Sequence, residues 1–179
     1  VVEQVLVNEV GPAVADSLIA QGVHAVAISG RSSGTLIAEP QRKLVDGTSA
    51  ELGLVGMITS VDTTAVNDLV KVGKVPVISP IATSVDGQIG FNVNADIAAA
   101  ALAGALDAQW LIIMTDVAGI YRSWPDTTSL ISQISYDELA AMKSTFAQGM
   151  APKVKACLDA IDGGASAVRI IDGTNPSAL

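Results

Sequence analysis

The sequence is poor in the residues that cross-link or catalyse in many small proteins. Its 179 residues include one cysteine, one histidine and only 3% aromatic residues. A single cysteine excludes a disulfide framework within the chain and favours a reducing compartment, so we expect a cytoplasmic protein. Cys157 is expected to be a small buried hydrophobe. His24 begins a short apolar run and is expected to be structural, which leaves little basis for a Ser-His-Asp or metal-hydrolase site.

Basic residues are also scarce. Lysine and arginine number 10 against 18 aspartate and glutamate residues, which gives a formal net charge of -8. No basic stripe is present, so nucleic acid is not expected as a partner. No apolar run approaches the ~18 residues of a membrane span, and the first residues lack the basic start of a signal peptide. A phosphorylated ligand is compatible with this acidity, because a nearby lysine outweighs the mean field at short range.

Two common phosphate-binding signatures are absent. The sequence contains no GxxxxGK[ST] loop. Residues 29–34, "SGRSSG", form a small-residue loop, but they lack the lysine and their glycine spacing misses GxGxxG. A nucleotide-binding function would therefore need other residues.

What the chain does have is a regular alternation of helical periodicity with short, nearly continuous apolar runs. This alternation predicts an α/β fold, a three-layer sandwich with a mainly parallel open sheet. Gly11-Pro12 predicts a kink in the first helix, Pro40-Gln41 a hairpin between residues 35–39 and 42–47, and Asp86-Gly87 a second hairpin turn. The predicted helices are residues 3–20, 63–73, 94–106, 135–145 and 152–161, and the other predicted strands are residues 24–29, 54–61, 74–81, 88–93, 110–116 and 166–172.

Polar side chains gather where a predicted strand meets a helix in "GFNVNAD", residues 90–96. Helix capping explains part of this cluster, because Asn94 fits an N-cap and Asp96 in the first turn gains from the helix dipole. Capping does not explain Asn92, at the end of the strand. In open α/β sheets ligands bind at the carboxyl ends of strands, so Asn92 is a candidate to bind a polar ligand and Asp96 to orient cations around it.

A lysine stands near the start of the helix predicted in "GMAPKVKACLDAI". Pro152 suits the first turn of a helix, which places Lys153 in that turn, where a cation opposes the dipole by about 0.3–1 kcal/mol. An anionic ligand would offset this cost, and a helix N-terminus with a lysine is a good phosphate site. A solvated surface lysine is the alternative that these residues leave open. Lys155 has the weaker claim and is expected at the surface.

A third polar cluster, "MTDVAGIY", follows the strand predicted at residues 110–116. As a binding loop it would offer backbone groups and Asp116 to a ribose or a base. Taken in order, the three clusters resemble the acetylglutamate kinases of the amino-acid-kinase superfamily. The stretches that carry the resemblance are "LVGMITSV", "VPVISPI", "FNVNADIAAAAL", "LIIMTDVAGIY", "GMAPKVKACLDAI" and "RIIDG", which run over essentially the whole chain, with "YRSWPD" similar to actinobacterial members.

The resemblance implies ATP-dependent phosphorylation of the γ-carboxylate of N-acetyl-L-glutamate in arginine biosynthesis, with ATP and Mg²⁺ as cofactors. It matches Asn92 to the residue that binds acetylglutamate, Asp96 to the aspartate that organises the catalytic lysines, and Lys153 to the lysine that stabilises the transferring phosphoryl group. The positions that it matches to nucleotide-contacting segments are Thr115, Asp116, Val117, Ala118, Gly119, Ile120, Thr145, Phe146 and Ala147.

The resemblance also predicts how the chain is organised. Residues 1–105 would be the C-terminal part of the amino-acid-substrate lobe and residues 106–179 a truncated nucleotide-binding lobe, within a single amino-acid-kinase domain. The family's first strand, its other catalytic lysine and its glycine-rich phosphate loop would precede Val1, and its extreme C-terminal segment would follow Leu179. A homo-oligomer, either dimer or hexamer, is implied. Two alternatives stay open: another amino-acid kinase, or a non-catalytic nucleotide- or arginine-binding remnant.

Overall fold

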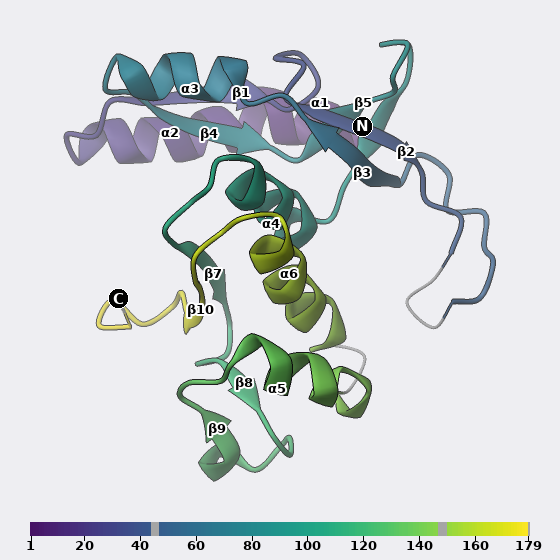
Figure 1. The fold of residues 1–179 in the computed structure, drawn as a ribbon. Helices are drawn as coiled ribbons and strands as arrows, with labels where there is room; N and C mark the ends of the chain where they lie inside the picture. The colour runs from purple at the N-terminus through teal and green to yellow at the C-terminus, as the bar shows by residue number, and fades with distance from the viewer. Residues whose placement is uncertain (44–46, 147–149, 179) are drawn as a thin grey trace. The chain divides into compact units, whose positions relative to one another are not determined.

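A computed structural model describes residues 1–43, 47–146 and 150–178. The chain divides into two compact units, Val1–Ala98 and Ala99–Leu179, here called the N-terminal and C-terminal units (Figure 1). The N-terminal unit contains, in chain order, α1 (Val2–Val5), the π-helical η1 (Leu6–Val10), α2 (Gly11–Ala20), β1 (Ala25–Ser29), β2 (Leu36–Pro40), β3 (Gly56–Val61), α3 (Thr64–Lys71), β4 (Val75–Ser79), β5 (Ile81–Thr83), β6 (Gly90–Asn92) and the start of α4 (Ala95–Ala105).

The first helix is interrupted as the sequence predicts. The wider π-helical turn of η1 directly precedes Gly11, and Pro12 stands in the first turn of α2. Proline has no N–H to donate and its ring crowds the preceding turn, which accounts for the irregular backbone there. A Cβ on Gly11 would lie 3.0 Å from Oγ of Ser79, and that hydroxyl donates to the Leu6 carbonyl at 2.8 Å. The glycine therefore lets the helix approach the end of β4.

The strands β1 and β4 form a parallel pair in which Ser29 is opposite Ser79. Helix α2 packs on both strands and α3 packs on β4, and Figure 1 draws the two helices on opposite sides of the pair. Both serines are buried, with exposures of 2% and 6%. The parallel pair with a helix on each side confirms the α/β class and the helix–sheet–helix layering predicted from the buried, β-branched strands.

A four-stranded mixed sheet has the order β3-β2-β5-β6. The predicted hairpin around Pro40-Gln41 is wrong, because β2 pairs antiparallel with β3, so Pro40 is opposite Gly56 rather than any residue of the segment just after it. Part of the expected second strand, residues 44–46, lies outside the described residues. Pro80 also divides the strand predicted at residues 74–81, since β4 belongs to the two-stranded sheet and β5 to this one. A proline cannot donate to a ladder, so a break there is physically reasonable.

The turn at Asp86-Gly87 is confirmed. It joins the antiparallel strands β5 and β6, and Gly87 has a φ of 75°, which favours glycine. The Asp86 carboxylate accepts from the Ser84 hydroxyl at 2.5 Å and from the Gln88 N–H at 3.1 Å. These hydrogen bonds hold the pKa of Asp86 below its ordinary value, with the Ser84 hydroxyl as the larger cause.

The C-terminal unit continues α4 and adds further helices and strands. They are β7 (Leu111–Thr115), β8 (Ile120–Tyr121), the 3-10 helix η2 (Thr127–Ser129), β9 (Leu130–Ile131), α5 (Tyr136–Met142), the 3-10 helix η3 (Lys143–Thr145), α6 (Ala151–Asp162) and β10 (Val168–Asp172). The strands β7 and β10 pair in parallel, with Thr115 opposite Asp172. The small hairpin of β8 and β9 has no counterpart among the predicted elements, because strands of two residues carry no readable periodicity.

The hydrophobic core of the C-terminal unit gathers around α6. Val154, Ala156 and Ala160 have no exposed surface, and Cys157 is 6% exposed, which confirms the expectation of a buried cysteine. Core residues of α4, α5 and β7 belong to the same cluster. The tightly packed face of α6 therefore sets the orientation of the residues at the start of that helix.

Candidate active site

A loop follows the carboxyl end of β7, where the sequence predicts nucleotide contacts. The strand ends at Thr115, whose hydroxyl donates to the Asp116 carboxylate at 3.1 Å. Asp116 and Ala118 are exposed, whereas Gly119 and Ile120 are buried beneath the loop. Exposed residues therefore lie in the first part of the loop, and its end is buried.

The second predicted nucleotide segment lies after α5. Ser135 caps that helix in a capping box, since its hydroxyl accepts from the Glu138 N–H while the Glu138 carboxylate accepts from the Ser135 N–H. The helix is followed by η3, which ends at Thr145, and Phe146 comes next in extended conformation. Ala147, the last residue of the predicted segment, lies outside the described residues.

Helix α6 begins where the sequence places it. Ala151 and Pro152 open the helix, and Lys153 stands in its first turn. The turn contains no acidic residue, so the lysine is the only charged side chain there. Lys155 is exposed and forms an ion pair with Asp159 one turn later, as expected of a surface lysine.

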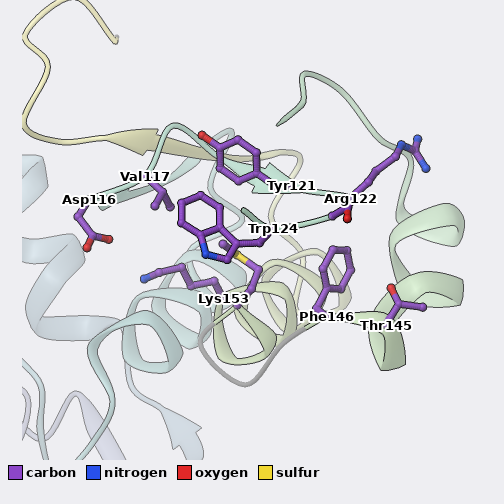
Figure 2. A pocket seen from close by; sticks show the side chains of 10 residues that line it. Asp116, Val117, Tyr121, Arg122, Trp124, Thr145, Phe146 and Lys153 are labelled. Atoms are coloured by element: carbon purple, nitrogen blue, oxygen red, sulfur yellow. The ribbon is translucent and has the colours of Figure 1, made fainter. Parts of the chain in front are cut away.

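Five of the predicted residues meet at one cavity of about 600 Å³ in the C-terminal unit. They come from the loop after β7 (Asp116 and Val117), from the segment after α5 (Thr145 and Phe146) and from α6 (Lys153), as Figure 2 shows. The volume is within the range of small-ligand sites. The structure therefore brings the loop after β7 together, within one unit, with two segments that come much later in the sequence.

The remaining wall of the cavity was not predicted. It is formed by Tyr121, Arg122, Ser123 and Trp124 from β8 and the following turn, and by Met150 before α6. The segment "YRSWPD" served in the sequence only as a family resemblance. The signal that could have found it is compositional, because two aromatic residues three positions apart are unusual in a chain with 3% aromatics.

The turn that carries Trp124 is held by hydrogen bonds on both sides. The Ser129 hydroxyl accepts from the Ser123 N–H at 3.1 Å and donates to the Asp126 carbonyl at 2.6 Å. The Asp126 carboxylate accepts from the hydroxyl and the N–H of Thr128 at 2.6 and 2.9 Å, and these bonds lower the pKa of Asp126. Trp124 therefore stands on a well-braced turn.

Asn92 and Asp96 belong to the N-terminal unit. The Asn92 N–H donates to the Leu54 carbonyl at 2.8 Å, which fixes the end of β6. The Asn94 side chain accepts from the Ile97 N–H at 3.2 Å, which confirms its role as the N-cap of α4, and Asp96 stands in the first turn. The side chains of Asn92 and Asp96 are both half-buried. Their predicted roles stay predictions: Asn92 toward acetylglutamate, and Asp96 toward the catalytic lysines.

Two further features bear on the class of site. Within residues 1–43, 47–146 and 150–178 no group of three or more His, Cys, Asp or Glu side chains is arranged to hold a metal ion. The same part of the chain has no helix that is both long enough and apolar enough to cross a bilayer.

Comparison with known proteins decides the family. Residues 1–172 match the model of the amino acid kinase family. The chain belongs to the amino acid kinase family. A solved structure from Streptococcus mutans UA159, smu.665, superposes with a TM-score of 0.77 at 24% identity, covering 95% of this chain and 66% of that one. At that identity the likeness supports the fold alone, and it agrees with the predicted amino-acid-kinase-like α/β class.

Curated members of the family are more similar in sequence. The acetylglutamate kinase of Mycolicibacterium vanbaalenii is 46% identical over 173 residues, which is 97% of this chain and 59% of that protein. The acetylglutamate kinase of Kineococcus radiotolerans is 46% identical over 180 residues, 97% of this chain and 60% of that protein. This amino acid kinase chain therefore spans about three fifths of the length of the curated relatives it matches.

Proposed function

We propose that this chain is the acetylglutamate kinase portion of its protein and acts in ATP-dependent phosphorylation of the γ-carboxylate of N-acetyl-L-glutamate, a step of arginine biosynthesis. The observation that carries the proposal is the 46% identity to acetylglutamate kinases over 97% of the chain. The cavity of the C-terminal unit, with Lys153 on its wall, supports the nucleotide half of the reaction. That level of identity favours this substrate over those of other amino-acid kinases, and over a non-catalytic remnant.

In this reaction the protein mainly has to position the two substrates and stabilise negative charge. A carboxylate with a reference pKa of about 4 is already ionised near neutral pH, so it needs no general base before it attacks the γ-phosphorus of ATP. The new bond joins a γ-carboxylate oxygen to phosphorus, the bond to the bridging oxygen of ATP breaks, and ADP leaves with the electron pair. Stabilising the charge on the transferring group is then the main task of the side chains. A single histidine outside the cavity is compatible with such a reaction.

Each predicted residue takes a role in this reaction. Lys153 would meet the negative charge that develops on the phosphoryl oxygens, aided by the positive end of the α6 dipole. Asp96 would orient the cations around the reacting group, and Asn92 would hold acetylglutamate. The nucleotide would contact Thr115–Ile120 and Thr145–Ala147.

The donor set fits a nucleotide better than a protein-held metal ion. Five of the ten described residues that line the cavity are apolar or aromatic, and Lys153 is a charged partner for phosphate. No described cluster offers three acidic or histidine ligands, so the residues fit Mg²⁺ only as a companion of ATP. When bound with ATP, Mg²⁺ would reduce the negative charge of the phosphates.

The test uses the purified natural gene product and traps the acyl phosphate with hydroxylamine. We expect ATP-dependent hydroxamate formation from N-acetylglutamate, and a fall in kcat of about 10²- to 10³-fold in Lys153→Ala, the size typical of losing one group that stabilises transition-state charge. Lys155→Ala is the matched control, because it removes an exposed lysine from the same helix, and it should stay within about twofold of wild type.

Two outcomes would contradict the proposal. If the wild-type protein formed no hydroxamate with N-acetylglutamate, the substrate would be wrong. If Lys153→Ala retained a kcat similar to that of Lys155→Ala, the catalytic role of Lys153 would be wrong while the substrate could stand.

The proposal includes a cytoplasmic location and a homo-oligomer, either dimer or hexamer, as the family resemblance implies. Size-exclusion chromatography with light scattering tests the second point. A monomer at micromolar concentration would contradict it.

A further inference from the structure

Aromatic side chains are concentrated at the cavity of the C-terminal unit. The chain has two tryptophans, two tyrosines and two phenylalanines, and one of each lines this cavity, namely Trp124, Tyr121 and Phe146. In a core built from aliphatic residues, this is the one place where rings of all three types meet among the described residues. Aromatic faces at a ligand site are suited to planar ligands.

Of the three rings that line the cavity, only Trp124 is exposed, since Tyr121 and Phe146 are half-buried. The exposure of Trp124 is 61%, although tryptophan buries a large area when it serves the core. Its ring contacts that of Tyr121 edge-on, with centroids 5.2 Å apart and an interplanar angle of 62°. This ring contact and the hydrogen-bonded turn from Ser123 to Ser129 both restrict the position of the indole.

The charged side chains that line the cavity lie on two sides of it, with Asp116 on one side and Arg122 on the other (Figure 2). Figure 2 shows the Lys153 amine pointing to the side where Asp116 lies, away from Phe146 and Thr145. In the same view the Trp124 indole is drawn between the Tyr121 ring and the Lys153 side chain. A ligand that carries a planar ring and phosphates can contact the indole and the Lys153 amine within this one cavity.

We infer that Trp124 is the specificity-determining residue for the base of the nucleotide: its indole face stacks on the base and selects a purine over a pyrimidine. The inference rests on the proposed function for placing a nucleotide in this cavity. Stacking on an aromatic side chain is available to every base, and the larger ring system of a purine covers more of the indole than a pyrimidine does. Selection for the purine follows from that difference in overlap.

The experiment measures binding of ADP, CDP and inorganic tripolyphosphate to the natural gene product by isothermal titration calorimetry. In Trp124→Ala we expect ADP to bind about 5- to 150-fold more weakly, the range that loss of one stacked base gives. The preference for ADP over CDP should shrink in the same variant. Tripolyphosphate, which has no base, should bind as it does to wild type.

Two further variants separate stacking from folding. Trp124→Phe keeps an aromatic face and should retain most of the affinity for ADP. Trp110→Ala is the matched control, because Trp110 is 60% exposed, lies in the same unit and does not line the cavity. It should leave all three affinities within about twofold of wild type.

Several results would overturn the inference: no binding of ADP to wild type, an unchanged affinity for ADP in Trp124→Ala, or an equal loss for ADP and tripolyphosphate in that variant. The last would show that Trp124 supports the phosphate site rather than the base. These results are distinct from a failure of the proposed function. If the protein binds ADP through Trp124 but forms no hydroxamate with N-acetylglutamate, the proposed substrate is wrong and the stacking role stands. If the protein is an active kinase and Trp124→Ala leaves the affinity for ADP unchanged, the proposed substrate stands and the stacking role is wrong.

Discussion

Val154 offers the sharpest test of how the first turn of α6 is held in place. It follows Lys153 directly, its side chain has no exposed surface, and its N–H donates to the Met150 carbonyl at 3.0 Å. Val154→Ala removes two methyl groups from a core that includes residues of α4, α5 and β7. The helix itself remains compatible with the change, because alanine is the better helix former.

The expected cost follows from three contributions. Burial of two methyl groups contributes about 1.6 kcal/mol at roughly 0.8 kcal/mol each. The cavity left behind adds up to about 1 kcal/mol if the surroundings do not collapse, and the gain in helix propensity offsets about 0.5 kcal/mol. We therefore expect the free energy of unfolding to fall by about 2 kcal/mol.

Urea unfolding followed by far-UV circular dichroism measures this change. Tryptophan fluorescence adds a signal from the C-terminal unit, which contains both tryptophans. Val70→Ala is the matched control, because it makes the same chemical change on α3 at a residue that is 56% exposed. It should alter the free energy of unfolding by less than about 0.5 kcal/mol. Equal effects of the two substitutions would refute the argument that the buried face of α6 fixes Lys153.

Two further predictions concern a close approach and a pH dependence. Gly30→Ala should destabilise the protein by about 1–3 kcal/mol in the same urea assay, because its Cβ would lie 2.6 Å from Cδ1 of Leu36 and 2.8 Å from the Ile81 carbonyl oxygen. A variant as stable as wild type would show that the loop after β1 has room for a side chain. In each of three Asp-x-Thr turns the threonine hydroxyl, and secondly its N–H, lowers the pKa of Asp62, Asp126 or Asp172 from 3.8. The pKa values of these carboxyl groups are lower in the folded state than in the unfolded state. Their stabilisation of the folded state is therefore present above pH 3.8 and is lost as the pH falls through the folded-state pKa values. Tm measured from about pH 6 to about pH 2 should decline most steeply below about pH 4. A Tm that is flat over that acidic limb would contradict these turns.

Local chemistry made much of the fold predictable. Helix starts carry strong signals, so Asn94 as the N-cap of α4 and Lys153 in the first turn of α6 were both placed correctly. The parallel direction of the β1–β4 and β7–β10 pairs agrees with the mainly parallel sheet predicted from the alternation of helices and apolar strands. These features depend on a few neighbouring residues, which is why sequence reasoning reaches them.

Pairing and short elements were harder to predict. The alternation in residues 35–39 identifies a strand but not its partner, and β2 pairs with β3 across an intervening segment rather than with the residues just after Pro40. The two-residue strands β8 and β9 have no period to detect, so the turn between them, and Trp124 with it, could not be assigned to the cavity. Partner choice is a property of the whole sheet, and local patterns do not carry it.

The candidate site shows which residues folding alone explains. Asp96 and Lys153 occupy the same position relative to their helices, the first turn, but with opposite charge. The dipole of α4 favours an acid there, so helix stability accounts for Asp96 without any ligand, whereas α6 carries a cation against its dipole at a cost of about 0.3–1 kcal/mol. Trp124 differs from the equally exposed Trp110 in that it lines this cavity, where its ring contacts that of Tyr121. Because Lys153 and Trp124 line the same cavity, a cation in the first turn of a helix and an exposed aromatic ring together point to a bound anion with a planar ring more strongly than the polar clusters that the helices themselves require.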